Sequence, residues 1–291
     1  MKNPLNVHSD LSEALAYNLD DFPLYTKKDE LYRYDYKAVI HYHPDLEFIY
    51  IVRGTMDYFI NGKKVRMNQG EGIFVNSQRL HYGFSDEKNE CTFIALVIHP
   101  DLFIHASSGA KQYFEMKFGY DNVDYILLYP HVLWQSEILQ LIVTINEEMT
   151  QDHIRILKVL SHALMVIDGI GEHIENKINE ALDHKDEIAF LNMTDYIHHN
   201  YGEKLTIEDI ANHGLVCRSK ACQLFKKFIR QTPNTYLNQY RLQKSKELLK
   251  DSHLTILDIA VLCGFNTSSY FGTIFKKEYG LSPAEYRKNN H

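Results

Sequence analysis

The chain has 291 residues and a formal net charge of −7, a length that suggests two domains with separate hydrophobic cores. Its beginning lacks a basic segment followed by an apolar run, and its longest apolar stretch, residues 93–98, is too short to span a bilayer, so we expect neither a secretion signal nor a membrane span. The four cysteines form no CxxC pair or disulfide framework, which fits a reducing cytosol.

The region from about residue 31 to residue 100 contains short strand-like runs separated by turn signals, of which Asn61-Gly62 is a strong hairpin signal. The runs are residues 37–40, 47–52, 56–60, 64–66, 72–75 and 92–98. Strands this short and evenly spaced predict a small antiparallel barrel or jelly roll.

Histidine, glutamate and glycine recur in this region at characteristic spacings. They form two series, His41, His43, Glu47 and Gly54, then Gly70, Gly72 and His81. This looks like the two motifs of the cupin superfamily, HxHxxxE followed by glycine, then glycine with a later histidine, although Asn76 occupies a place where proline is common. The resemblance implies that residues 1–130 form a cupin-like barrel that binds an effector.

The side chains of His41, His43, Glu47 and His81 allow three interpretations. They could form a metal site, because imidazole and carboxylate ligands suit Zn, Mn, Fe or Ni. Together with Tyr58, they could instead hydrogen-bond directly to a polar ligand such as a sugar or a related metabolite, for which an aromatic-lined barrel mouth is suited. The third interpretation is that His41 and His81 are ordinary surface residues near a barrel rim. We favour the polar ligand and expect no cofactor.

Residues 131–199 are predicted to be helical, with an acidic polar side. Two apolar stripes have helical spacing, Ile138, Leu141, Ile142, Ile145 and Met149, then Ile154, Leu157, Leu160, Leu164 and Ile167. Gly169 and Gly171 are expected to end the second helix. Packing against the barrel of the same chain would account for both stripes. Residues 131–182 would then be a connecting region, and residues 183–187, which are polar and charged, the interdomain linker.

The last third of the chain is basic, in contrast to the rest. Residues 201–291 hold 14 Lys and Arg against 8 Asp and Glu, whereas residues 1–200 hold 17 against 30. Because like charges repel, only the last third can lie against the phosphates of a nucleic acid without a penalty.

An internal repeat lies in the same third. Residues 206–211 (TIEDIA) recur as residues 255–260 (TILDIA) at an offset of 49, and residues 225–227 (FKK) recur as residues 275–277 at an offset of 50. Each copy is predicted to be a helix, a tight turn and a second helix, the arrangement whose second helix enters a major groove.

The second copy shows these signals best. Thr255 is the expected N-cap of its first helix, Gly264 supplies the turn, and Thr267 or Ser268 caps its second helix. Residues 233–250 are predicted to form one helix of roughly 27 Å between the copies. Added to the widths of the two copies, this can place two recognition helices about 34 Å apart, one turn of DNA.

An ordered set of residues in and after the second copy carries a family resemblance. The set is Ile259-Ala260, Gly264-Phe265, Ser269-Tyr270-Phe271, Phe275-Lys276-Lys277, Gly280, Ser282-Pro283 and Tyr286-Arg287. The last part of the chain thereby resembles the AraC/XylS family of transcription regulators, many of which carry a cupin-type sensor domain. The resemblance implies two helix-turn-helix units within residues 183–291, and helices after the barrel that pair two subunits.

The first copy departs from the family pattern. Leu215 stands where the turn glycine is usual, with Gly214 one residue earlier, and Cys217 replaces the usual serine cap. Ala221 stands where a larger apolar residue is common, and Arg230 where glycine is common. We expect the first unit to be less rigid or to dock differently on DNA.

Candidate DNA contacts lie on the second helix of each copy. By analogy with the family, the residues that read base edges are Ser219, Cys222 and Gln223 in the first unit and Ser268, Ser269 and Thr273 in the second. The candidates for phosphate contact are Arg218, Lys220, Lys226, Lys227, Lys276 and Lys277. For the lysines, an ordinary solvated helix face is an equally good explanation.

The sequence therefore favours an α+β protein with an N-terminal antiparallel cupin-like barrel, following helices and a C-terminal all-α domain of two helix-turn-helix units. We expect a ligand-responsive transcription regulator, not an enzyme, that binds double-stranded DNA in the cytoplasm as a homodimer, with RNA polymerase as a possible further partner. The alternatives are a metallocupin enzyme with a DNA-binding anchor and a nucleoid-type protein without sequence preference.

Overall fold

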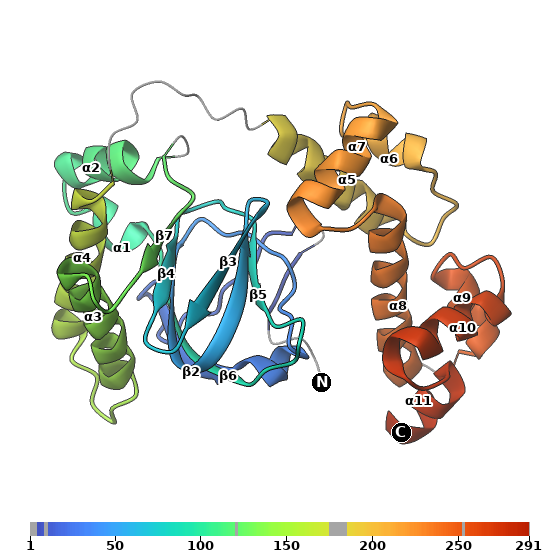
Figure 1. Ribbon diagram of the computed structural model, residues 1–291, viewed down its shortest axis with the longest axis horizontal. Coiled ribbons are helices and arrows are strands. Elements are labelled where there is room, and N and C mark those ends of the chain that lie inside the picture. The colour runs from blue at the N-terminus through green and yellow to red at the C-terminus, as the bar shows by residue number, and fades with distance from the viewer. Residues whose placement is uncertain (1–4, 9–10, 120–121, 175–184, 252–253, 291) are drawn as a thin grey trace. The chain divides into compact units, whose positions relative to one another are not determined.

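The computed structural model describes residues 5–8, 11–119, 122–174, 185–251 and 254–290 (Figure 1). The chain divides into two compact units, Met1–Asp183 and His184–His291. The first unit is an antiparallel sheet with helices, and the second is helical, as the fold class inferred from the sequence requires. In the described part of the chain, no helix has the length and apolar character needed to cross a membrane.

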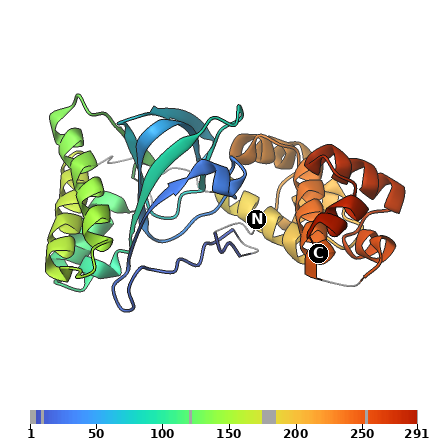
Figure 2. The ribbon, with the colours of Figure 1, turned by 90° about the horizontal axis from the view of Figure 1, so that it is seen from below.

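The longest strand, β2 (Leu46–Ile60), organises the first unit. Its first half pairs with β4 (Gly72–Val75) and β6 (Cys91–Ile98), and its second half pairs with β3 (Lys63–Asn68) and β5 (His81–Phe84). All four pairings are antiparallel, so β2 belongs to both halves of the curved sheet seen in Figure 2.

The outer strands are β1 (Leu24–Glu30), which pairs with β6, and β7 (Tyr125–Leu128), which pairs with β4. Among the described residues the strand order ends at β1 and β7, so the expected barrel is an open sheet and not a closed one. The strands β1, β5 and β7 lie outside the predicted runs.

Gly54 lets β2 continue between its two halves. Its φ is +85°, and a Cβ atom there would lie 2.1 Å from the carbonyl oxygen of Glu90. The register against β6 shifts just before this glycine, as in a β-bulge. The runs 47–52 and 56–60, expected as separate strands, are therefore one strand.

The strand expected at residues 37–40 is wrong. The chain there forms only one isolated bridge, between Lys37 and Phe84. It follows a short 3-10 helix, Leu31–Tyr34, and the next two residues, Asp35 and Tyr36, have φ values of +54° and +60°. These left-handed residues turn the chain out of the extended conformation.

Helices cover one side of the sheet, as Figure 2 shows. They are α1 (Asp101–Ile104), α2 (Ser108–Phe118), α3 (Leu133–Met149) and α4 (Ile156–Glu172). The aromatic side chains of Phe48 and Phe74 lie in the core that these helices share with the sheet. Gly169 and Gly171 lie within α4 and do not end it; a Cβ atom on Gly171 would lie 2.1 Å from the hydroxyl of Tyr113, so glycine allows close packing.

The second unit contains two helix-turn-helix units separated by a long helix (Figure 1). Its helices are α5 (Lys185–Asn200), α6 (Ile207–His213), α7 (Arg218–Ile229), α8 (Pro233–Asp251), α9 (Ile256–Leu262), α10 (Ser268–Tyr279) and α11 (Pro283–Asn290). Residues 185–187 form the first turn of α5, so that part of the expected linker is wrong. The other two residues of that linker, 183 and 184, lie outside the described residues.

The same capping box begins both helix-turn-helix units. The hydroxyl of Thr206 accepts from the backbone of Asp209, whose carboxylate accepts from the backbone of Thr206. Thr255 and Asp258 repeat the arrangement in the second unit, and the hydroxyl of Thr267 caps α10. The predicted caps are therefore confirmed, because capping depends on residues only three positions apart.

Backbone geometry shows how the first helix-turn-helix unit differs from the second. The turn residues Leu215 and Gly264 have φ values of +53° and +75°, so the first unit places a leucine in a conformation that favours glycine. Cys217 makes no side-chain cap to α7. Arg230 ends α7 at a φ of +58°, where the second unit has Gly280.

Replacing Leu215 tests whether its left-handed backbone conformation costs stability. Leu215→Gly is expected to raise the free energy of unfolding by about 0.5–1 kcal/mol, because the side chain is 90% exposed and its backbone is left-handed. Urea unfolding of the full chain measures it. The control, Gly264→Ala, is expected to lower stability, since its Cβ atom would lie 2.5 Å from the carbonyl oxygen of Tyr201. An unchanged or lower value for Leu215→Gly would contradict the strain.

Candidate functional site

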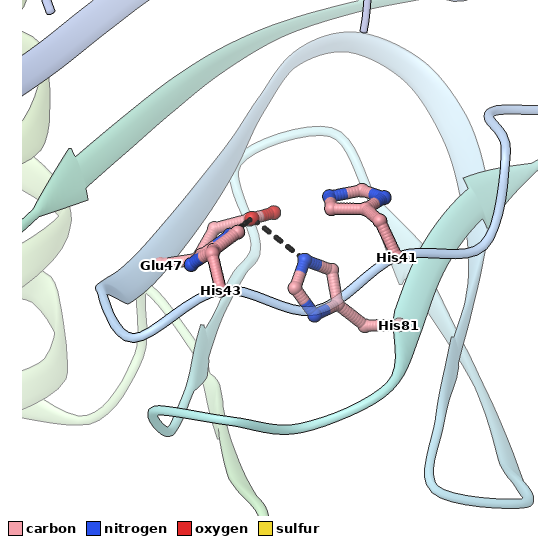
Figure 3. Close-up of side chains that lie close together, drawn as sticks. All are labelled: His41, His43, Glu47 and His81. Carbon is pink, nitrogen blue, oxygen red and sulfur yellow. Dashed lines mark hydrogen bonds and ion pairs between the residues drawn. The ribbon is translucent and has the colours of Figure 1, made fainter. Parts of the chain in front are cut away.

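Three histidines and one glutamate meet inside the first unit (Figure 3). His41 and His43 precede β2, Glu47 lies near its start, and His81 begins β5. All four side chains are buried, and one potential ligand atom from each lies within 4.8 Å of the others. The fold thus brings the residues of both sequence motifs into one cluster, and their burial rules out surface histidines near a rim.

Backbone pairing holds two of the rings together. His41 and His81 exchange backbone hydrogen bonds of 3.2 and 2.9 Å, and their ring centroids are 4.4 Å apart. The second half of β2 pairs with β5 from Ile60 opposite His81. The bent β2 therefore supplies Glu47 from one half and positions His81 through the other.

The carboxylate of Glu47 is the centre of the cluster. Its Oε2 accepts hydrogen bonds from Nε2 of His43 at 3.0 Å and of His81 at 2.9 Å, and its Oε1 accepts from the hydroxyl of Tyr58. Burial acts to raise the pKa of Glu47, but the charge of His81 and the two histidine hydrogen bonds lower it well below its usual value. Burial acts to lower the pKa of His81, but the charge of Glu47 raises it overall. The cluster thus holds a buried, hydrogen-bonded ion pair.

Backbone carbonyls orient two of the imidazoles. Nδ1 of His41 lies 2.8 Å from the carbonyl oxygen of Val39, and Nδ1 of His81 lies 2.7 Å from that of Arg79. Because a carbonyl oxygen only accepts, each Nδ1 carries a hydrogen, and Nε2 is the atom available to the cluster. Carbonyl-oriented imidazoles beside a carboxylate are the usual surroundings of a divalent transition metal. The donor set of the cluster therefore fits a metal ion as well as a polar ligand.

The chain segment before β1 also reaches the cluster. Oε2 of Glu13 lies 3.3 Å from Nε2 of His41, and the Glu13 side chain is 6% exposed. Burial, and then the charge of Glu47, raise the pKa of Glu13 to about 7. The hydroxyl of Tyr17 donates to Asp45 at 2.7 Å, close to His43. Sequence reasoning missed Glu13 because no motif surrounds it and only the fold places it beside His41.

The candidate base-reading residues lie on the helices expected. On α7, Ser219 and Gln223 are exposed and Cys222 is half-buried. On α10, Ser269 and Thr273 are exposed and Ser268 is half-buried. The hydroxyl of Thr273 donates to the carbonyl of Ser269 at 2.9 Å, an intrahelical bond that leaves its oxygen able to accept.

Ion pairs separate the phosphate candidates into two groups. In the first helix-turn-helix unit, three candidates are paired with acids. Arg218 pairs with Glu208 at 3.1 Å, and Asp186 pairs with Lys220 at 2.7 Å and with Lys227 at 3.2 Å. The others, Lys226, Lys276 and Lys277, are exposed and make no salt bridge with any residue that the structure describes. The second helix-turn-helix unit therefore presents its candidate lysines, Lys276 and Lys277, directly to solvent.

Arg241, on α8, connects the two helix-turn-helix units. Its guanidinium donates to the carbonyl oxygens of Tyr201 and Glu203, each at 2.7 Å, in the segment before α6. The same group lies 5.9 Å from the ring centroid of Phe265, just after the turn of the second unit. A Cβ atom on Gly264 would lie 2.8 Å from Nη2 of Arg241, so that glycine also makes room for the arginine. Sequence reasoning did not identify this residue.

Comparison with known proteins follows the same division of the chain. Residues 211–289 match a helix-turn-helix domain, and residues 34–99 match a cupin domain. The HTH-type transcriptional regulator YdeC of Bacillus subtilis is 30% identical over 257 residues, which cover 86% of each chain. The melibiose operon regulatory protein of Escherichia coli K12 is 26% identical over 85% of this chain and 83% of its own. The HTH-type transcriptional activator RhaS of Enterobacter sp. is 27% identical, over 85% and 87%.

Proposed function

We propose that this chain, which belongs to the AraC/XylS family of transcription regulators, binds specific sites on double-stranded DNA and responds to a small polar ligand in its cupin domain. The family membership supplies the DNA-binding activity. The observation that carries the response is the buried cluster around Glu47, because a structural core does not need four converging ionisable groups. Such a device acts by favouring one arrangement of the DNA-binding units over another.

The proposed DNA contacts come from α7 and α10. Gln223 is the candidate for a bidentate contact with adenine, and the short hydroxyls of Ser269 and Thr273 discriminate less. The helix between the units, α8, has 19 residues and spans about 28 Å. This length supports contact with two successive major-groove segments on one face of the duplex.

The proposed effector is rich in hydroxyl groups. Imidazole, carboxylate and phenol groups converge from His41, Glu47 and Tyr58, and Nε2 of His41, the ionised carboxylate and the phenol oxygen can each accept a hydrogen bond from a hydroxyl. One relative is named for the operon of a sugar, melibiose, which supports a sugar or a related metabolite as the effector. This ligand would compete with Glu13 for Nε2 of His41.

A second candidate is a divalent metal ion in the same cluster. The carbonyl-fixed Nδ1 atoms of His41 and His81 favour it, because they turn two Nε2 atoms toward the carboxylate of Glu47. His43 and Glu47 would complete the ligand set. The ion would supply a Lewis-acidic point for binding an oxygen of the effector, and it requires no catalysis by the chain.

The proposed dimer forms through α4. Val159, Ala163 and Ile167 of this helix are buried within the unit, so of the predicted stripe only Ile167 lies on the buried face. Leu157 and Leu164, seven residues apart, are 81% and 41% exposed. An apolar face that stays exposed in one chain is suited to a second copy of that chain.

The DNA-binding proposal is tested by selecting genomic fragments of the source organism at near-physiological salt. We expect enrichment of a few upstream regions. Lys276→Gln is expected to weaken binding to all duplexes and to reduce the salt slope by about 1. Gln223→Ala is expected to change the preference at one base position, at a cost of about 1–3 kcal/mol there. Uniform retention of all fragments would contradict sequence-specific binding.

The effector proposal is tested by thermal unfolding of EDTA-treated protein. Melibiose and other mono- and disaccharides are added in one series, and Zn²⁺ or Mn²⁺ in another. A sugar at 100 times its Kd is expected to stabilise the protein by about 2.7 kcal/mol in the wild type and in the control His105→Ala, whose side chain is 76% exposed, but not in His43→Ala. The same pattern with the metal ion alone would favour the second candidate. No response to either series would contradict a ligand site at the cluster.

The dimer proposal is tested by sedimentation of a Leu157→Glu, Leu164→Glu double variant. We expect a monomer with unchanged circular dichroism, because buried glutamates would oppose each other at the interface. Leu257→Glu, at a 58% exposed position in the second unit, is the matched control and is expected to remain dimeric. A dimeric double variant would contradict an interface at α4.

A further inference from the structure

One carboxylate holds two lysines of the first recognition helix. Asp186 lies in the first turn of α5, with Oδ1 2.7 Å from Nζ of Lys220 and Oδ2 3.2 Å from Nζ of Lys227. Each oxygen thus pairs with a different lysine. The lysines are seven residues apart, about two turns, so they lie on the same side of α7.

The two lysines flank the proposed base-reading residue. Lys220 precedes Gln223 by three residues, and Lys227 follows it by four, so the three share one side of α7. A phosphate bound beside Gln223 would need the same ammonium groups that Asp186 holds. An unpaired carboxylate at this place would also repel the phosphate.

The internal repeat provides a comparison within the same chain. Lys277 is the counterpart of Lys227 at the offset of 50, and it makes no salt bridge with any described residue. The counterpart of Asp186 at the offset of 49 is Thr235, which also lies in the first turn of its helix. The hydroxyl of Thr235 pairs instead with that of Thr232 at 2.8 Å. The fold of a helix-turn-helix unit therefore does not require an acid at this position.

We infer that Asp186 is a built-in competitor of DNA phosphate, which lowers the affinity of the first helix-turn-helix unit and leaves the second unit to dock first. The inference rests on the proposed DNA-binding function. The helical C-terminal part of the chain, His184–His291, begins at residue 184, so the first turn of α5 is the region of that part nearest in sequence to the sheet-containing part, Met1–Asp183. A displacement of this turn would uncover Lys220 and Lys227 together.

The test measures binding of the full chain to a random-sequence duplex and to the best duplex from the selection. Asp186→Asn is expected to raise the affinity for both by about three- to tenfold at ~0.1 M salt, because two partly exposed ion pairs are removed. Asp195→Asn, on the same helix about 14 Å away, removes the same charge and is expected to change the affinity less than twofold. Thermal unfolding checks that each variant is folded.

The same substitution in a variant that lacks both lysines tests whether the gain in affinity comes from freeing them. With Lys220→Gln and Lys227→Gln present, Asp186→Asn is expected to give a smaller gain than in the wild-type background, since it then removes only the repulsion between an unpaired carboxylate and phosphate and frees no lysine. An unchanged or lower affinity for Asp186→Asn, a gain equal to that of Asp195→Asn, or a gain that is equally large without the lysines would each overturn the inference. If the inference fails but the wild type binds DNA, the proposed DNA-binding function still stands. If neither the wild type nor Asp186→Asn binds any duplex, the inference and the proposed function are both overturned.

Discussion

The guanidinium of Arg241 sets the relation between the two DNA-binding units. It is buried on α8, donates to two carbonyl oxygens before α6, and lies against Phe265 at the turn of the second unit. A buried cation is stable only where such acceptors satisfy it, so the segments on both sides are held to the same helix. Because α8 is continuous between the units, their separation is fixed by its length. The proposed recognition of two successive grooves depends on that separation.

The sheet-containing part of the chain, Met1–Asp183, also depends on a buried charge whose hydrogen-bonding partners satisfy it. Glu47 is buried, and its ionised form is maintained by His43, His81 and Tyr58. Loss of any one partner leaves a buried polar group unsatisfied, which is costly. The partners come from three different places in the chain, so a ligand that changes one of these bonds affects the whole cluster. This makes the cluster a suitable place for an effector to act.

Local signals in the sequence predicted the structure well. The caps at Thr255 and Thr267 and the turn at Gly264 depend on residues close in the chain, and each lies where it was expected. The strand expected at residues 37–40 was wrong because two left-handed residues precede it, and β2 was divided because the bend at Gly54 resembled a strand break.

The functional residues that sequence reasoning missed depend on distant pairings. Glu13 reaches His41 across 28 positions, Arg241 reaches Tyr201 across 40, and Asp186 reaches Lys227 across 41. No periodicity or motif marks such residues, since any exposed acid or base on a helix has the same local pattern. The cluster itself was predictable because His41, His43 and Glu47 are closely spaced and the resemblance to the two cupin motifs adds His81. The choice between a sugar and a metal ion was not, because both use the same donor atoms.

Hydroxyl-radical footprinting of the full chain on its best selected duplex tests the central claim most directly. Two recognition helices held by α8 at a fixed spacing should protect two segments on one face of the DNA, with centres about 10 base pairs apart. A single protected segment, or two segments whose spacing varies between selected sites, would contradict the account.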